Sequence, residues 1–193
     1  LLSLGADGPR VHPDEVRYLI AASSLVEGEG LALRGQDYGF GPLLPLVLAA
    51  ILWVAGSVDA AYDWFKAANA LFFALTAVPA YLLARRLVSQ WWAVLAAGLA
   101  IAIPTVMTES LSYLTTMWAL YAIAMALERP TVLRQLAVLG TVAAALLTRT
   151  QFGILYVTWV GALTCLWLLA PATRPRSRAD LRRFWPTALP VVL

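Results

Sequence analysis

The chain has little charge, one cysteine and one histidine. Charged side chains make up 13% of its 193 residues, about half the share usual in soluble domains, whereas 61% are apolar. The low charge argues against a water-soluble globule, and the apolar excess excludes an intrinsically disordered chain. A lone Cys165 excludes a disulfide framework and a cysteine-rich zinc site. The composition therefore predicts an integral membrane protein.

The motifs of soluble nucleotide chemistry are missing as well. The sequence contains no GxGxxG, no phosphate-binding loop ending in Lys-Ser or Lys-Thr, and no Ser-His-Asp set. Its formal net charge of +3 is too thinly spread for a nucleic-acid-binding surface. We therefore expect membrane lipids, and no nucleic acid, among its partners.

Long apolar runs occupy most of the chain. A bilayer core about 30 Å thick needs roughly 20 apolar helical residues. Five runs are long enough or nearly so, at residues 67–84, 91–107, 110–127, 132–148 and 152–170, and a sixth begins near Trp185. The run Leu43–Ala55 is shorter and is bounded by Pro42 and Gly56, which predicts a helix lying in or dipping into the membrane interface. We expect an all-α fold, a polytopic transmembrane helical bundle with interfacial helices on its outer face.

The basic residues predict the direction of the spans. Nine of them fall on one side and five on the other, and the close pairs such as Arg85-Arg86 and Arg182-Arg183 are all on the richer side. Short cytoplasmic loops collect Lys and Arg, so that side is predicted to be cytoplasmic. If Leu43–Ala55 does not cross the membrane, the residues before it lie outside the cytoplasm. If it does cross, residues 1–42 lie on the cytoplasmic side.

These features predict one membrane module over residues 1–193. Residues 10–58 form its outer segment with interfacial helices, and residues 65–193 form its transmembrane helices. With Leu43–Ala55 not crossing, two spans separate Asp14 from Glu109, so both carboxylates are expected on the non-cytoplasmic side. The protein is expected to cross a cell membrane, inner or plasma, several times.

Three acidic residues are candidates for chemistry. Asp14 and Glu15 follow Pro13 at the predicted start of an amphipathic helix on the outer leaflet. A carboxylate held there can act as a general base on a hydroxyl, or the two acids only stabilise the start of the helix. Glu109 lies between two apolar runs, where a carboxylate is costly unless it is solvated, paired or in a cavity. It either contributes to a site or caps the next helix.

Basic residues supply candidates for holding an anion. Arg149 is the only charged residue in the stretch 135–173, and its guanidinium fork matches the geometry of a phosphate. Its alternative role is simple anchoring to lipid headgroups. Lys66 is a weaker candidate of the same kind. The lone His12 is either a ligand or an acid of the site, or an ordinary hydrogen-bonded loop residue.

The order of these features resembles the GT-C superfamily of membrane glycosyltransferases. The Asp14-Glu15 pair and an amphipathic helix precede the run 38–42 (Tyr-Gly-Phe-Gly-Pro), a short apolar helix, a span ending in Arg85-Arg86, and Glu109 at the next outer face. Within the superfamily, the pattern is closest to the bacterial group of protein O-mannosyltransferase-like and lipid A aminoarabinose transferase-like enzymes. The resemblance covers the amino-terminal part of a typical member.

One departure from that pattern affects the expected site. Many members carry Glu-Lys just before the proline pair, where this chain has Phe40 and Gly41. The missing acid puts metal dependence in doubt, and the missing lysine shifts the phosphate role toward Arg149 or Lys66.

The resemblance implies a function and a set of roles. It implies transfer of a sugar from a polyprenyl-phosphate-linked donor to an extracytoplasmic glycolipid, cell-envelope glycan or protein, in a bacterial membrane. Asp14 would be the base with Glu15 assisting, and a divalent cation, if used, would be held by Asp14 and Glu109. Substrate binding is assigned to Glu109, Arg149, Lys66, Tyr38 and His12. A membrane transporter or lipid flippase and a non-catalytic membrane subunit are the alternatives.

Overall fold

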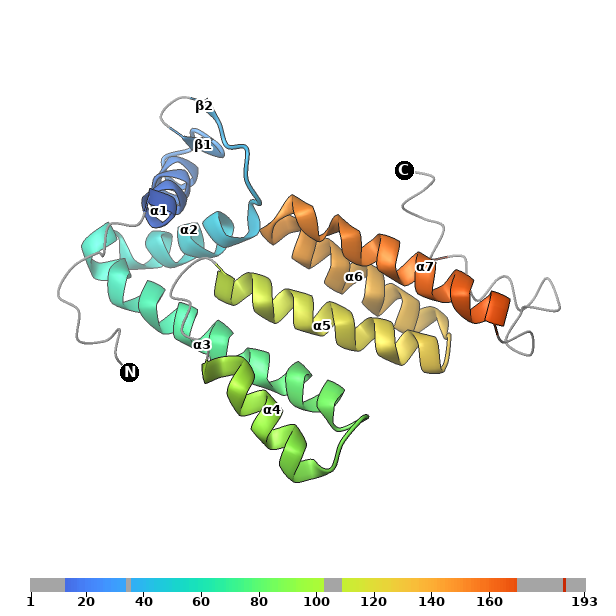
Figure 1. Cartoon of the computed structure of the whole chain (residues 1–193). Coiled ribbons are helices and arrows are strands. Elements are labelled where there is room, and N and C mark those ends of the chain that lie inside the picture. The colour runs from blue at the N-terminus through green and yellow to red at the C-terminus, as the bar shows by residue number, and fades with distance from the viewer. Residues whose placement is uncertain (1–12, 34–35, 103–108, 170–185, 187–193) are drawn as a thin grey trace.

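The part of the chain that the structure describes is mostly helical (Figure 1). The computed structural model describes residues 13–33, 36–102, 109–169 and Pro186. Within these ranges, the α-helices are α1 (Pro13–Val26), α2 (Leu43–Ala55), α3 (Val58–Ala84), α4 (Gln90–Ala102), α5 (Glu109–Glu128), α6 (Val132–Thr148) and α7 (Ile154–Leu169). A 3₁₀ turn, η1 (Thr150–Gly153), joins α6 to α7, and β1 (Ala32–Leu33) pairs antiparallel with β2 (Gln36–Asp37). The helical fold class is as predicted, and the small β ribbon is an addition to it.

Three helical stretches are long and apolar enough to cross a membrane, which indicates a membrane protein. They are Val58–Ala84, Ser110–Glu128 and Thr150–Leu169. The first begins earlier than the predicted run 67–84, because Ser57 caps the helix by accepting a hydrogen bond from the Ala60 N–H at 3.3 Å. The other two overlap the predicted runs 110–127 and 152–170.

The remaining apolar helices are shorter. α2 has the predicted bounds and ends at Gly56, whose φ of 76° favours glycine. α6 also has its predicted bounds, but its 17 residues rise only about 25 Å. α4 has 13 described residues, and the end of the predicted run 91–107 lies outside the described residues. The described chain thus holds three helices of spanning length where five were expected; the run from Trp185 also lies outside it, except for Pro186.

The outer segment is attached to the start of α3 by a small apolar core. Ala22 of α1 is fully buried against Leu48 and Leu52 of α2 and Ala61 and Phe65 of α3. The amphipathic helix predicted at the membrane surface therefore packs on protein through its alanine face. This packing determines where Tyr18, on the same helix, is held.

A second core joins α5, α6 and α7, which lie side by side in Figure 1. Trp159 of α7 is completely buried, together with Ala119 and Ala126 of α5 and Val142 and Ala145 of α6. Alanines at such positions let helix backbones approach closely, so that the indole fills the space between them. The helices of this core carry the α6–α7 junction, where the site described below is found.

Polar contacts tie helix ends together. Arg86, just after α3, forms an ion pair with Glu128 at the end of α5. The Nη1 group of Arg134 in α6 donates to the carbonyl of Met125 in α5 at 2.7 Å. The ends of α3 and α5 and the start of α6 therefore share one end of the helices, which carries several arginines. At the start of α5, the Ser110 hydroxyl donates to Oδ1 of Asn69 in α3.

Candidate functional site

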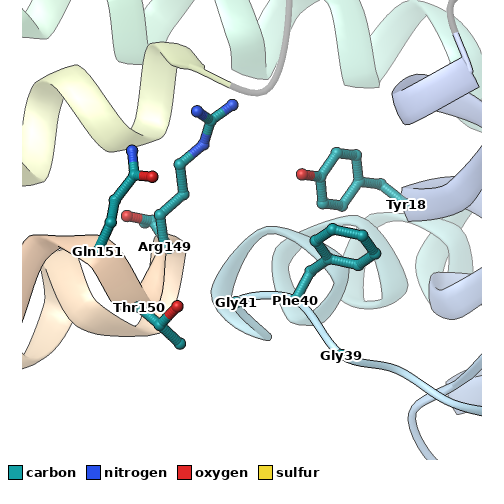
Figure 2. Close-up of a pocket in the computed structure, with 8 residues that line it drawn as sticks. Tyr18, Gly39, Phe40, Gly41, Arg149, Thr150 and Gln151 are labelled. Carbon is teal, nitrogen blue, oxygen red and sulfur yellow. The ribbon is translucent and has the colours of Figure 1, made fainter.

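A cavity of about 280 Å³ lies between the outer segment and the end of α6 (Figure 2). Three parts of the chain form it: α1, the loop before α2, and the junction of α6 with η1. Its lining residues are Tyr18, Gly39, Phe40, Gly41, Thr148, Arg149, Thr150 and Gln151. The fold therefore brings together segments that are far apart in the sequence.

Arg149 supplies the cation of this cavity. It ends α6 in an extended conformation (φ −151°, ψ 127°), and its N–H still bonds to the Ala145 carbonyl at 3.0 Å. The change from helix to extended backbone turns the chain at the cavity edge. Figure 2 shows the Arg149 and Gln151 side chains extending on the same side, with the Tyr18 hydroxyl pointing toward them across the gap. Of the residues predicted to bind substrate whose side chains the structure describes, Arg149 is the one that lines the cavity.

Aromatic rings form the opposite wall. The Tyr18 and Tyr38 ring centroids are 6.3 Å apart at 67°, and those of Tyr38 and Phe40 are 5.6 Å apart. The Cζ atom of Arg17 lies 5.6 Å from the Phe40 centroid, within the range of a cation–π contact. Tyr38, predicted to bind substrate, supports the two lining rings Tyr18 and Phe40 without itself lining the cavity. The wall can stack against a flat apolar face while Arg149 neutralises an anion.

The predicted base belongs to the helix that carries Tyr18. Asp14 and Glu15 lie in the first turn of α1, and Asp14 precedes Tyr18 by one helical turn, about 6 Å along the axis. The side chains of both acids lie outside the described residues, and so does all of His12. The structure therefore places only the backbone of these two acids near the cavity.

Glu109 occupies the first position of α5, and its side chain is also outside the described part. Its neighbour Ser110 is completely buried and bonded to Asn69, so the backbone at the start of α5 is held against α3. The approach of the Asp14 and Glu109 carboxylates to each other remains a prediction. The same holds for their role as ligands of a divalent cation. Among the side chains that the structure describes, no three His, Cys, Asp or Glu come together as a metal site.

Lys66 lies apart from the cavity lining. Its Nζ is 2.9 Å from Oδ1 of Asp63 and 5.0 Å from the centroid of the Tyr62 ring, all on α3. Between the two predicted phosphate ligands, the geometry thus favours Arg149. A role for Lys66 in binding substrate remains a prediction.

Sequence reasoning did not select several of the lining residues. Thr150 and Gln151 directly follow Arg149, and this adjacency was a signal that could have identified them. Tyr18 had a weaker signal, its position one turn after Asp14. Thr148 directly precedes Arg149 and carried the same signal, but nothing in the sequence indicated its contact with the loop before α2.

Comparisons of the chain with protein-family models, with curated proteins and with solved structures find no match.

Proposed function

We propose that the chain is part of a membrane glycosyltransferase that takes its sugar from a polyprenyl-phosphate-linked donor. The observation that carries this proposal is the cavity in which Arg149 faces Tyr18 and Phe40, one helical turn from the Asp14-Glu15 pair. A cation, an aromatic wall and a nearby carboxylate-bearing helix are the groups that such a transfer needs.

The chemistry requires few protein groups. The lipid phosphate is a competent leaving group, so no acid has to protonate the departing oxygen. Asp14 accepts the proton of the acceptor hydroxyl, with Glu15 assisting, while the acceptor oxygen bonds to the anomeric carbon of the sugar. The bond between that carbon and the phosphate oxygen breaks, and Arg149 stabilises the negative charge left on the lipid phosphate.

The cavity suits the headgroup of the donor. Its volume of about 280 Å³ is just below the usual range for ligand pockets, about 300–1,000 Å³, so it suits a small headgroup such as a sugar phosphate, with the polyprenyl chain left in lipid. Arg149 can contact two phosphate oxygens at once through its planar fork. The hydroxyl of Thr150 and the amide of Gln151 provide additional donors and acceptors beside it.

The positions of the arginines give the orientation in the membrane that we propose with this chemistry. The end of the helices that carries Arg85, Arg86 and Arg134 faces the cytoplasm under the positive-inside rule. The cavity, at the opposite end of α6 from Arg134, then opens on the non-cytoplasmic side, and α2 lies in that interface. The acceptor is accordingly an extracytoplasmic glycolipid, glycan or protein, and the membrane is a bacterial inner or plasma membrane crossed several times.

The test is transfer from a labelled donor. The purified full-length protein that contains this chain is placed in lipid nanodiscs and incubated with radiolabelled polyprenyl-phosphate sugars and a membrane extract containing acceptors. We expect transfer of label that is lost in Arg149→Ala and kept in Arg85→Ala, an exposed arginine at the other end of the helices. Donor binding without transfer would indicate a non-catalytic subunit, and the absence of binding would refute the proposal.

A further inference from the structure

We infer that Gly41 is a positioning residue: its missing side chain lets the loop before α2 dock on the end of α6 and close the cavity between Phe40 and Arg149. Only the identity of the ligand, a lipid-linked phosphate, rests on the proposed function. The docking itself is a geometric statement about two backbones.

The steric evidence is specific to this glycine. A Cβ atom at Gly41 would overlap the carbonyl group of Thr148 and would lie 2.6 Å from the Leu147 carbonyl oxygen. Both obstacles are backbone atoms at the last turn of α6, so no side-chain rotation can relieve the overlap. Any larger residue at this position has to move the loop away from the helix.

The loop also has contacts on its other side. Tyr38 packs between Tyr18 and Phe40, and its N–H bonds to the Leu31 carbonyl at 3.2 Å. The loop therefore bridges α1 and α6, with aromatic contacts at one end and the glycine contact at the other. A displacement at Gly41 cannot be absorbed by the loop without disturbing one of these contacts.

The contact between Gly41 and Thr148 sets the width of the cavity, because each of these residues is next in sequence to a residue of the cavity wall. Phe40 directly precedes Gly41, and Arg149 directly follows Thr148. The distance between the two backbones at this contact therefore determines the gap between the aromatic wall and the guanidinium. A displacement of about 1 Å at such a site can cost about a hundredfold in activity.

Two other glycines provide matched controls. A Cβ atom at Gly39, in the same loop, would have no neighbouring atom within 4 Å, so a methyl group there should not move the loop. Gly153, in η1, would meet only the Leu146 side chain at 3.5 Å, an ordinary van der Waals contact. Gly39→Ala serves as the control for the distance measurement, and Gly153→Ala serves for both distance and binding.

The first measurement is the distance between the two docked parts. Spin labels are placed on the exposed residues Glu27 and Thr158 of the full chain, with Cys165 replaced by serine. Gly41→Ala should lengthen or broaden the distance distribution, whereas Gly39→Ala and Gly153→Ala should leave it as in the parent. If Gly41→Ala gives the distribution of the two controls, the proposed docking is wrong, whatever the ligand is.

The second measurement is affinity for geranyl phosphate, with geraniol as the uncharged comparison. We expect binding about tenfold weaker in Gly41→Ala and unchanged in Gly153→Ala, because the charge-assisted contact to Arg149 is lost. If Gly41 acts through the placement of Arg149, Gly41→Ala should cause no further loss in an Arg149→Ala background. Additive losses would show a merely structural role and would overturn the positioning claim.

A third measurement covers the case in which Gly41→Ala does not fold. Cysteines at Gly39 and Thr150, on opposite sides of the docked contact, should be joined by a short bis-maleimide in a chain that keeps Gly41 and has Cys165 replaced by serine. Failure of this cross-link would overturn the docking. If docking is found but the parent protein does not bind geranyl phosphate, the proposed function fails while the inference about the contact stands.

Discussion

Arg86 donates a hydrogen bond from Nη1 to Oε1 of Glu128, joining the end of α3 to the end of α5. The Arg86 guanidinium also lies over the Tyr121 ring, with Cζ 5.2 Å from its centroid. Two of the helices of spanning length are therefore held together at one end by charge, while a hydrogen bond joins Ser110, at the start of α5, to Asn69, near the middle of α3.

The ion pair should contribute modestly to stability. Glu128 is about half exposed, so Glu128→Gln should lower the free energy of unfolding by less than about 1 kcal/mol, and high salt should reduce the difference. Thermal unfolding in detergent measures it, with Glu27→Gln, an exposed glutamate after α1, as control. Equal effects of the two substitutions would contradict the assignment.

The charge of Arg86 should persist at alkaline pH. The hydrogen bond to Glu128 raises the pKa of the Arg86 guanidinium above its ordinary value. Stabilisation by a group with a raised pKa is fully present below the ordinary pKa and is lost only as pH rises above it. The Arg86 contribution should therefore be constant between about pH 6 and about pH 9. A loss of the Glu128→Gln effect within that range would contradict this prediction.

Substitution by alanine should lower the stability of the protein at Ser110 but not at Ser112. The buried Ser110 hydroxyl bonds to Asn69, so Ser110→Ala should destabilise by about 1 kcal/mol. The Ser112 hydroxyl is also buried but has no hydrogen-bond partner within the described part of the chain, so Ser112→Ala should be neutral or stabilising. Thermal unfolding of both variants checks this, and equal losses would show that the Asn69 bond contributes nothing.

The proposed catalytic role of Asp14 predicts a loss of turnover without a loss of donor binding. Asp14→Asn keeps the size of the side chain but removes the base, which should lower the transfer rate by about 10²–10⁴. Asp37→Asn, an exposed acid in the same outer segment, is the control and should keep the parent rate. Normal turnover in Asp14→Asn would reduce Asp14 and Glu15 to residues that stabilise the start of α1.

The proposed role of Arg149 as a phosphate ligand predicts weaker donor binding in its variants. In that role Arg149 makes a charged contact to the phosphate before and during the reaction, so Arg149→Ala should raise the donor dissociation constant at least about tenfold. Arg149→Lys should restore only part of the affinity, because an ammonium group lacks the bidentate fork. Equilibrium binding of polyprenyl phosphate measures both variants. Full recovery by lysine would mean that only the charge matters.

The proposed topology predicts which sites react from each side of the membrane. Single cysteines at Glu29, Asp59 and Ser89, all exposed, are introduced with Cys165 replaced by serine. In sealed vesicles, Glu29→Cys and Asp59→Cys should react from the same side, because in the proposed topology α2 lies between them without crossing. Ser89→Cys, after α3, should react from the opposite side. Labelling of positions 29 and 59 from different sides would show that α2 crosses.

Local features of the sequence were enough to predict the helical membrane class and several helix bounds. α2 begins after Pro42 and ends at Gly56, and α6 begins after Thr131, whose side chain accepts from the Arg134 N–H. Such signals act within about one helical turn, so they can be recognised without knowing the rest of the fold. The length of an apolar run can also be read without knowing the fold, because the thickness of the bilayer sets how many residues a spanning helix needs.

Only the tertiary structure decided which of the candidate residues lie close to one another. Arg149 looked like a phosphate ligand from its isolation in an apolar stretch, but its position opposite Tyr18 depends on how α1 and α2 pack against α3 and α6. The closeness of Gly41 to the Thr148 carbonyl depends on the same packing. Contacts between distant segments follow from the volumes buried across several helices at once, and no local pattern of the sequence records those volumes. Composition and periodicity therefore determined the helices, and the burial of alanine faces between them determined the site.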